Sequence, residues 1–354
     1  MSHELAHHPR SVLERLPTWL ICVPLTLQWL GLALRYRSAT LPSVANPDIT
    51  AGGLVGEGKL EYFRAMGLVA QAATAKHCAI RNNIAYTIAE LQQQIAAAGL
   101  VFPVIAKPDL GLCGYGVRLV ANIQELSDYL RVFPVDEVVV VQEYLSDDGE
   151  AGIFYARHPE EAHGQIIGLT LRHYPQVVGD GQLNVGELIQ RNPRAQRLFR
   201  AQKHQCNYPI DDIPAQGQVV RLATIGSTRV GGLYRDGSQH ISPALTAAID
   251  TIARDMPHFY FGRFDVRFAD LFALRQGQHF KIMEINGAGS EAIQAWDPNT
   301  SLWTAFRIIF AKQRLLFAIG SANRAKGYRP ISLRQLAALH FRQRELIENY
   351  PPSN

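Results

Sequence analysis

Hydrophobic and polar residues alternate along residues 263–268, and a second alternating run covers residues 280–286. The two-residue period of both runs predicts half-buried β-strands. Between them, Arg275-Gln276-Gly277-Gln278 is a turn signal. We therefore expect the two runs to pair as an antiparallel hairpin with some irregularity in register.

The two predicted strands carry acidic and amide side chains among their apolar residues. The expected pairing brings Asp265 close to Glu284 and Asn286. Three oxygen donors at the end of a buried sheet are costly to desolvate unless a positive group joins them, and a hard divalent cation prefers oxygen ligands. Taken alone, these residues leave two interpretations open: a metal site, or two strand ends with ordinary solvated side chains.

The rest of the chain mixes helical and strand patterns. The run "EVVVVQEYL" at 137–145 is the most β-branched segment and predicts a central strand. We expect helices at 59–66, 84–98, 123–133 and 243–253, and strands at 68–74, 101–106, 117–121, 219–225 and 231–234, with β-type alternation over 151–180. Hairpins without regular crossovers indicate an α+β fold.

Residues 19–34, "WLICVPLTLQWLGLAL", form the most apolar segment. Pro24 and Gln28 lie inside it, and it is shorter than the roughly 20 residues that span a bilayer, which disfavours a transmembrane helix. Trp19, Trp29 and the two arginines that follow would suit a membrane interface. The alternative, which we prefer, is a helix buried against the body of the protein.

The composition is that of a globular protein. With 354 residues, 47% of them hydrophobic, the chain can build one large domain or roughly two to three smaller ones. We expect an N-terminal segment at 1–58 with an apolar helix and a connector, a main domain at 59–300, and a basic helical C-terminal extension at 301–354.

The net charge of +4 is unevenly distributed, since residues 301–344 contain nine Lys or Arg and no Asp or Glu. Such a segment could face acidic lipid, a phosphate-bearing substrate or nucleic acid, or it could simply form solvated helices. Because its aromatic residues are not interleaved with the basic ones at a readable spacing, we expect no nucleic-acid partner. The four cysteines have neither disulfide-framework nor zinc spacing, which favours a reducing, cytoplasmic compartment.

Two glycine-containing segments suggest phosphate binding, and one of them is rejected. Residues 53–59, "GLVGEGK", match a P-loop only until Leu60 occupies the required hydroxyl position, and no apolar strand precedes them. In "IAKPDLGLCGYGVRLV", Lys107 leaves a strand and is followed by Gly111, Gly114 and Gly116. This segment offers an ammonium group and backbone N–H donors to a polyphosphate, although a glycine-rich hairpin with a chance lysine would look the same.

The segment "VVVVQEYLSDDGEAG" offers groups that could bind a nucleoside. The end of its strand, at Gln142, Glu143, Tyr144 and Leu145, exposes backbone donors and acceptors that could recognise an adenine edge. Glu150 could accept hydrogen bonds from ribose hydroxyls. The alternative is a core strand that runs into an acidic turn.

Taken together and in this order, the segments resemble the ATP-grasp superfamily of ATP-dependent carboxylate–amine ligases, which includes D-alanine:D-alanine ligase. The resemblance covers about residues 59–297. It implies that Lys107 and a preceding lysine bind the nucleotide, with Lys59 and Lys76 as the two candidates for the latter. Arg263-x-Asp265 and Glu284-x-Asn286 are similar to the family's R-x-D and E-x-N motif, which is the most specific match in the chain.

The resemblance also implies a fold, a set of ligands and a reaction. It predicts two α+β subdomains that clasp ATP, and one or two Mg²⁺ ions held by Asp265, Glu284 and Asn286. Arg263 and Lys107 would stabilise the transferring phosphoryl group, and backbone N–H groups near Gly289 would support a tetrahedral oxyanion. A small-molecule carboxylate would form an acyl phosphate that a small-molecule amine then attacks.

Two other functions remain open from the sequence. One is a nucleotide-binding module without catalysis, recruited to a membrane or a protein partner. The other is an ATP-grasp phosphotransferase. The complete R-x-D and E-x-N pair favours an enzyme, because a binding module would not need all four side chains.

Overall fold

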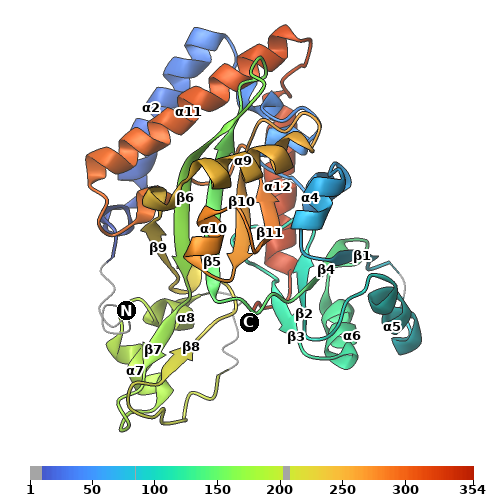
Figure 1. The fold of residues 1–354 in the computed structure, drawn as a ribbon, viewed down its shortest axis with the longest axis vertical. Coiled ribbons are helices and arrows are strands. Elements are labelled where there is room, and N and C mark those ends of the chain that lie inside the picture. Colours follow the sequence, from blue (N-terminus) through green and yellow to red (C-terminus); the bar gives the residue numbers. More distant parts are fainter. Residues whose placement is uncertain (1–9, 84, 202–207) are drawn as a thin grey trace.

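The computed structural model describes residues 10–83, 85–201 and 208–354. Two antiparallel sheets form its body (Figure 1). The larger sheet has the order β11-β10-β5-β6-β9, with β5 (Gly149–Ala156), β6 (Gln165–His173), β9 (Leu233–Asp236), β10 (Phe261–Phe268) and β11 (Phe280–Asn286). The smaller sheet has the order β1-β4-β2-β3, with β1 (His77–Arg81), β2 (Val104–Pro108), β3 (Arg118–Val120) and β4 (Val138–Glu143). The α+β class predicted from the sequence is confirmed.

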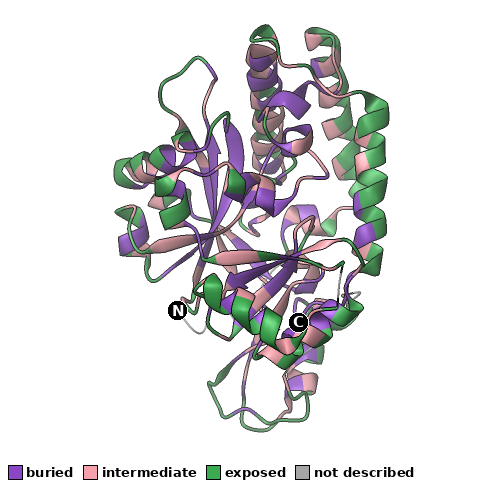
Figure 2. Cartoon of the chain, turned by 90° about the vertical axis from the view of Figure 1, so that its right-hand side faces the viewer, coloured by how far each residue is buried: buried purple, intermediate pink, exposed green. Residues whose placement is uncertain are grey.

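Each sheet has its own set of helices. The core of the larger sheet includes residues of α3 (Lys59–Arg64), α4 (Leu68–Ala73), α9 (Pro243–Arg254) and α10 (Leu271–Arg275). The core of the smaller sheet includes residues of α5 (Ile88–Ala97), α6 (Ile123–Val132) and α12 (Leu333–Asn349). Figure 2 shows the buried residues concentrated in the strands, with exposed faces on the surrounding helices.

A third, small core joins the ribbon of β7 (Gln176–Val178) and β8 (Val219–Arg221) to α7 (Val185–Arg191) and α8 (Gln196–Arg200). The remaining α-helices are α1 (Val12–Arg15), α2 (Thr18–Tyr36) and α11 (Leu302–Ala325). The short 3₁₀ turns are η2 (Leu41–Val44), η3 (Thr50–Gly53), η4 (Thr228–Val230), η5 (Ser238–His240) and η6 (Ile293–Trp296).

The β-branched run predicted as a central strand is β4, which lies between β1 and β2. Val139, Val140 and Val141 are completely buried, and they contribute to the cores of both sheets. Burial of one valine side chain stabilises the fold by about 1.5–3 kcal/mol, so this short strand is a major contributor to stability.

Residues 68–74 were expected to form a strand, and this prediction is wrong. Leu68–Ala73 form α4, because a distant residue caps the helix: the backbone N–H of Ala70 donates to the Asp255 carboxylate at 2.9 Å. Only Thr74 forms an isolated β-bridge, with Ile282. A second difference lies within the predicted hairpin. Its connection contains α10, whose N-cap Asp270 accepts a hydrogen bond from the backbone N–H of Ala273, and the expected turn follows that helix.

The apolar N-terminal segment forms α2, which lies beside α11 (Figure 1). The preferred expectation of a helix buried against the body holds for one face only: Leu32 is the single buried residue of α2, and Trp29, Ala33 and Tyr36 pack around it. By length and composition, α2 could cross a membrane.

The basic segment near the C-terminus forms two helices that pack on different parts of the molecule. The α11 helix contacts α2 and the turn η2, whereas Leu346 of α12 joins the core of the smaller sheet. Tyr350, which follows α12, stacks on Phe133 of the same core. The segment is therefore integrated into the fold at two separate places.

Candidate active site

The polar residues of the predicted hairpin lie together on one face. In the antiparallel pairing of β10 and β11, Arg263 is opposite Asn286 and Asp265 is opposite Glu284, and the register shifts immediately after Asp265. The Asn286 amide donates to the Asp265 carboxylate at 3.3 Å. The predicted pairing, including its irregularity, is confirmed, and it brings the two carboxylates and the amide together.

Asp265 is enclosed by guanidinium groups. Arg263 donates to it through Nε at 2.6 Å and through a terminal nitrogen at 2.9 Å. Arg172 on β6 approaches the same carboxylate to 3.1 Å. The Asp265 side chain is only 4% exposed, so these charges balance it in a site almost without solvent. No sequence motif had identified Arg172.

From the sequence, Glu150 could accept hydrogen bonds from ribose hydroxyls. In the structure, its carboxylate already has other partners. Arg172 lies 3.1 Å from its carboxylate and Arg267 lies 3.8 Å from it. The Tyr174 hydroxyl donates to the same group. Since both carboxylate oxygens have cationic or hydroxyl partners, Glu150 serves in this structure to hold Arg172 next to Asp265.

Glu284 is the more accessible carboxylate of the pair, with its side chain 33% exposed. Lys59 lies 3.2 Å from it. Burial alone would raise the pKa of Glu284, but the positive charges of Lys59 and Lys107 outweigh burial and lower it well below the ordinary value. Glu284 is therefore ionised at neutral pH between two ammonium groups.

Lys107 is held by two acceptors from different sheets. Its ammonium donates to the Gln142 side chain at 2.7 Å and to the Met283 carbonyl at 2.9 Å. Burial lowers its pKa to about 8; the Glu284 charge opposes this shift and Lys59 adds to it. Because Gln142 lies on β4 and Met283 on β11, Lys107 marks the point where the two sheets meet.

The sequence left open whether Lys59 or Lys76 is the first nucleotide-binding lysine. The two side chains differ clearly in burial and in their contacts. Lys59 is buried, and its ammonium also donates to the Asp109 carbonyl at 3.3 Å. Lys76 is exposed, and its backbone N–H donates to Glu143 at 3.2 Å. The ammonium of Lys59, on α3, thus lies at the Glu284 carboxylate and beside the glycine-rich loop.

The three glycines of that loop have different surroundings. Gly114 and Gly116 have φ angles of +75° and +73°, which favour glycine. A Cβ atom on Gly111 would lie 2.7 Å from the Lys59 ammonium nitrogen. Glycine at 111 is therefore what allows this lysine to approach the loop backbone.

The glycine-rich loop is held from both sides. Arg229 donates to the carbonyls of Cys113 at 3.2 Å and Gly114 at 3.4 Å, and its guanidinium lies 4.1 Å from the centre of the Tyr115 ring. The Gln343 amide of α12 donates to the Gly111 carbonyl at 3.2 Å. The C-terminal helix thus contacts the loop that is predicted to cover phosphates.

The predicted adenine-binding residues lie at the end of β4 and just after it. Tyr144 and Leu145 are half-buried, and Gln142 is 2% exposed. The Gln142 side-chain nitrogen is buried, and within the described residues no hydrogen-bond acceptor reaches it. A buried donor without an acceptor is costly, so this position suits a ligand that supplies one.

Gly289 does not have the free backbone N–H that an oxyanion site would need. Its N–H donates to the Gly53 carbonyl, and a Cβ atom on Gly289 would lie 2.4 Å from the Leu54 carbonyl oxygen. The N–H of Gly289 is occupied because residues 53–59, the segment rejected as a P-loop, pack directly on residues 287–289. In this structure Gly289 permits that close approach.

Two titratable side chains near the hairpin were missed by sequence reasoning. Glu57 accepts hydrogen bonds from the Tyr62 hydroxyl and, at 3.2 Å, from the backbone N–H of Gly287. Burial raises the pKa of Glu57 to about 7, against the effect of these two hydrogen bonds. Lys312 of α11 donates to the Ser290 carbonyl, and burial lowers its pKa to about 8. Neither residue belongs to a recognisable motif.

The oxygen donors of the hairpin suit a hard cation by type, with Glu284 as the accessible carboxylate, because both Asp265 oxygens are paired with guanidinium groups in this structure. Asp265, Glu284 and Asn286 supply two carboxylates and an amide on one face. Among the described residues, no three His, Cys, Asp or Glu side chains could hold a metal ion by themselves. A Mg²⁺ ion here would therefore need phosphate oxygens and water as further ligands, which is its usual mode of binding.

The chain contains further polar residues that belong to no motif, among them Asp297, Arg221 and His204. Asp297 forms an ion pair with Arg235 at 3.4 Å, and the Arg221 guanidinium lies 3.3 Å from the centre of the Tyr174 ring. His204 lies outside the described residues.

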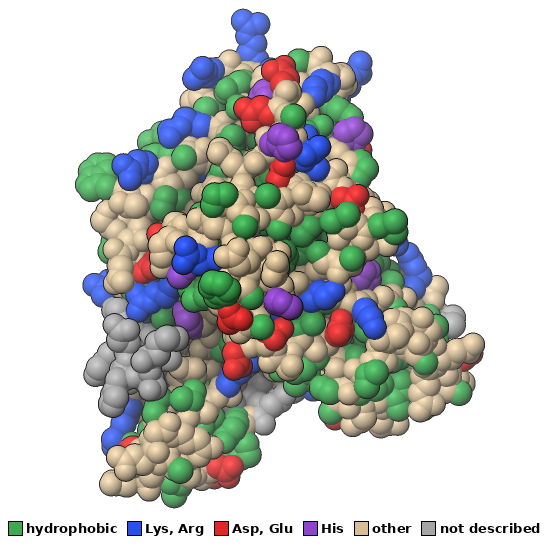
Figure 3. Space-filling view, in the orientation of Figure 1, with side chains coloured by type: hydrophobic (Ala, Val, Ile, Leu, Met, Phe, Trp, Pro, Cys, Tyr) green, Lys and Arg blue, Asp and Glu red, His purple; other side chains and the backbone are tan. Residues whose placement is uncertain are grey.

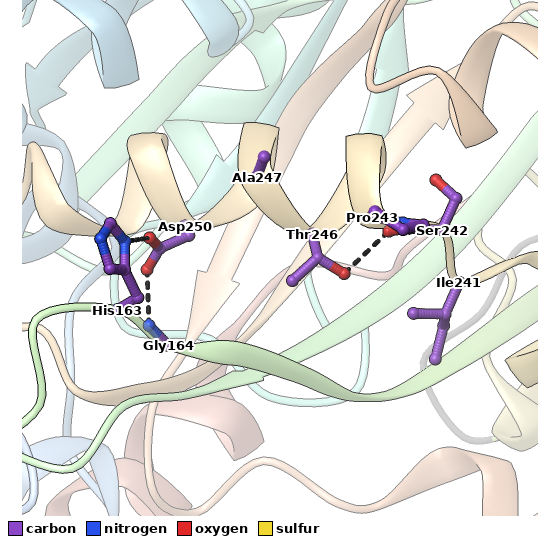
Figure 4. A pocket seen from close by; sticks show the side chains of 8 residues that line it. All are labelled: His163, Gly164, Ile241, Ser242, Pro243, Thr246, Ala247 and Asp250. Atoms are coloured by element: carbon purple, nitrogen blue, oxygen red, sulfur yellow. Dashed lines mark hydrogen bonds and ion pairs between the residues drawn. The ribbon is translucent and has the colours of Figure 1, made fainter.

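A separate cavity of about 490 Å³ lies against α9 (Figure 4). Its polar end is formed by the His163 imidazole, which lies 2.8 Å from the Asp250 carboxylate. The Tyr155 hydroxyl and the Gly164 N–H also donate to Asp250, at 2.7 Å and 2.8 Å. Because none of the predicted site residues lines this cavity, we do not assign it to the same site.

No protein-family model and no curated protein matches the chain. Among solved structures, it is similar to a bifunctional glutathione synthetase from Pasteurella multocida, with 18% identity and a TM-score of 0.37, over 75% of this chain and 38% of that one. The chain thus spans less than half the length of that protein. It is also similar to a D-alanine–D-alanine ligase from Bacillus anthracis, with 14% identity and a TM-score of 0.42, over 79% of this chain and 72% of that one.

Proposed function

We propose that the chain is an ATP-grasp enzyme that uses ATP and Mg²⁺ to join a carboxylate to an amine. One observation carries this proposal: Lys59 and Lys107, from two separate elements, converge on Glu284, which lies opposite Asp265 on the hairpin. Alternating cationic and anionic groups at the junction of two sheets suit a nucleotide polyphosphate together with its counter-ion.

The lysines and Arg263 would bind and orient the phosphates. The two acceptors of the Lys107 ammonium hold it in place before a ligand arrives, which lowers the cost of ordering it. Lys59 would contact phosphate from the other side of Glu284. Arg263, fixed by its two bonds to Asp265, would stabilise negative charge on the transferring phosphoryl group.

The hairpin carboxylates and the loop would complete the nucleotide site. Asp265, Glu284 and Asn286 would hold Mg²⁺, which when bound neutralises charge on the phosphate oxygens. Backbone N–H groups of the loop with Gly111, Gly114 and Gly116 would cover the phosphates. The strand end from Gln142 to Leu145 would bind the base, with the side-chain nitrogen of Gln142 as a donor.

The proposed chemistry needs no nucleophile from the protein. A carboxylate oxygen of the substrate attacks the γ-phosphorus, the bond from that phosphorus to the bridging oxygen breaks, and ADP leaves. The nitrogen of the amine then attacks the acyl carbon, inorganic phosphate leaves with the bonding electrons, and the amine loses a proton. Positioning and electrostatic stabilisation are the contributions of the chain.

The test is the formation of ADP and phosphate by the purified chain with MgATP across a panel of amino acids, dipeptides and small carboxylates. Glu284→Gln keeps the shape of the side chain and removes its charge. Glu160→Gln is the matched control, because the Glu160 side chain is 74% exposed and lies outside the site. We expect ADP formation that requires both a carboxylate and an amine, persists in Glu160→Gln and falls at least about a hundredfold in Glu284→Gln.

Two results would contradict the proposal. ADP formation with a phosphorylated acceptor and no amide product would identify a phosphotransferase. Tight MgATP binding without ADP formation under any substrate combination would favour a nucleotide-binding module.

A further inference from the structure

One face of α2 is apolar and exposed along the whole helix. Its members are Trp19, Val23, Leu27, Leu30 and Leu34, whose exposed fractions range from 51% at Val23 to 80% at Leu34. Successive spacings of three or four residues place them on one side of an α-helix. We call these five residues the outer stripe of α2. Soluble monomers rarely expose a continuous apolar surface of this kind without a partner for it.

The opposite face of α2 is attached to the body of the protein. Gln28 donates through its amide to the Phe310 carbonyl at 2.8 Å and to the Gln313 side chain at 3.1 Å. Leu32 packs in a small core with Phe317, and Arg324 donates to the Tyr36 carbonyl at 2.8 Å. These contacts fix α2 along α11, so the outer stripe points away from the protein.

The charged residues of the two helices that carry and support the stripe are all basic. Neither α2 nor α11 contains an Asp or Glu residue. Arg35 and Arg37 are exposed at the end of α2, and Arg307 and Arg314 are exposed on α11. Figure 3 shows hydrophobic and basic side chains together along the upper left edge of the molecule, where these helices lie. An apolar stripe on helices whose charged residues are all basic is complementary to a surface that is apolar inside and negative outside.

An anionic lipid bilayer has this combination of properties. We propose that α2 lies in the interface of such a bilayer, with its outer stripe at the level of the acyl chains and the arginines at the phosphate head groups. Trp303, at the start of α11 and 86% exposed, would add an aromatic side chain of the kind that is enriched at interfaces.

The attachment of α2 to α11 argues for a helix that lies along the bilayer and does not span it. A spanning α2 would carry α11 into the hydrocarbon or lose its contacts with α11. Because α11 contains Arg307, Lys312 and Arg314, its insertion would be costly. The outer stripe can enter the interface while every contact between the two helices is kept.

The test is co-sedimentation of the purified full chain with vesicles of phosphatidylcholine alone and of phosphatidylcholine mixed with phosphatidylglycerol. The double variant Leu27→Glu, Leu30→Glu places charge in the outer stripe. The matched control is Leu68→Glu, Phe272→Glu, which alters two even more exposed apolar residues on α4 and α10. Circular dichroism and thermal unfolding verify that both variants keep the fold.

We expect binding to the anionic vesicles that weakens with salt. The stripe variant should lose about tenfold or more in the vesicle-bound to free ratio, and the control should keep it. Replacing Arg35 and Arg37 by Gln should weaken binding to anionic vesicles by about tenfold or more without affecting the neutral ones.

Three results would overturn the proposal. The first is no binding to any vesicle, or equal binding by the stripe variant. The second is a wild-type dimer in sedimentation velocity that the stripe variant dissociates, because the stripe would then bind a second copy of the chain. The third is vesicle-bound protein that resists both high salt and alkaline extraction, as a spanning helix would.

Discussion

The ammonium group of Lys59 lies 3.2 Å from the Glu284 carboxylate, so that α3 is joined to β11 at the centre of the candidate active site. The same ammonium group donates to the Asp109 carbonyl and lies close to Gly111 in the glycine-rich loop. Lys59, on α3, therefore contacts both the hairpin and the loop. The relationship makes Lys59 the better candidate for the first nucleotide-binding lysine.

Replacing Lys59 by Met should weaken MgATP binding by about ten- to a hundredfold. This is the effect of removing one hydrogen bond between a charged group and phosphate, about 1.5–3 kcal/mol. Isothermal titration with MgATP measures it. Lys76→Met, which changes an exposed lysine, is the control and should bind like the wild type. Equal losses in both variants would remove the distinction between the two lysines.

The depressed pKa of Lys107 predicts a pH dependence of ATP use. Its pKa of about 8 means that the ammonium loses its proton at mildly alkaline pH, so kcat/KM for ATP should fall as the pH rises through about 8. In Lys107→Arg the side chain stays charged, and this fall should disappear, whatever the absolute rate. A pH profile of kcat/KM with the same alkaline limb in both proteins would show that another group is responsible.

The lowered pKa of Lys107 also determines how stability changes with pH. Between about pH 8 and the ordinary lysine value of 10.5, the folded chain has lost the proton that the unfolded chain retains. The Lys107 contribution to the free energy of unfolding should therefore rise with pH over this window. Urea unfolding of the wild type and Lys107→Met across the window measures the difference, and a wild-type contribution that falls with pH would contradict it.

Gly289→Ala should destabilise the fold by about 1–3 kcal/mol, because the new Cβ atom would collide with the Leu54 carbonyl. Gly31→Ala is the control. Within the part of the chain that the structure describes, no atom lies within 4 Å of a Cβ at this exposed helical position, so the substitution should stabilise the chain slightly. Urea unfolding measures both effects. If Gly289→Ala kept full stability but lost turnover, the oxyanion role first expected for this residue would be restored.

Glu14 should anchor the N-terminal segment through a buried ion pair. Its carboxylate lies 2.8 Å from Arg194 and 2.7 Å from Arg197. Glu14→Gln should lower the free energy of unfolding by about 3–5 kcal/mol at neutral pH, since it removes the negative charge of a buried ion pair and leaves the positive charges in place.

The pH dependence of this effect follows from the pKa of Glu14. Burial alone would raise that pKa, but Arg194 and Arg197 lower it below 4.5. The stabilisation is therefore present above pH 4.5 and is lost as the pH falls through the folded-state pKa. Unfolding of wild type and variant at neutral and acidic pH should show a difference that shrinks with acidification; a constant difference would contradict the assignment.

Local patterns predicted the parts of the fold that depend on short-range sequence. The alternation in 263–268 and 280–286 gave the hairpin, and the valine run gave β4, because side-chain period and β-branching act within a few residues. The same reasoning failed for 68–74. The cap on α4 comes from Asp255, far away in the sequence, so no local pattern contained it.

The sequence predicted only those residues of the candidate active site that belong to a recognisable motif. Asp265, Glu284 and Asn286 were brought together as expected, whereas Arg172 and Glu57 were missed. Arg172 reaches Asp265 because β6 lies two strands from β10 in the larger sheet, and Glu57 reaches Gly287 because its loop packs on the end of β11. Strand order and loop packing of this kind are properties of the folded chain, with no local signal.

The dependence of ATP affinity on Mg²⁺ tests the central claim most directly, namely that the β10–β11 hairpin forms the metal and phosphate site. ATP binding is measured by calorimetry with Mg²⁺ and with a chelator, for the wild type, Glu284→Gln and the control Glu160→Gln. We predict that Mg²⁺ tightens ATP binding at least about tenfold in the wild type and the control but not in Glu284→Gln. The same Mg²⁺ dependence in Glu284→Gln would contradict the claim and place the metal elsewhere.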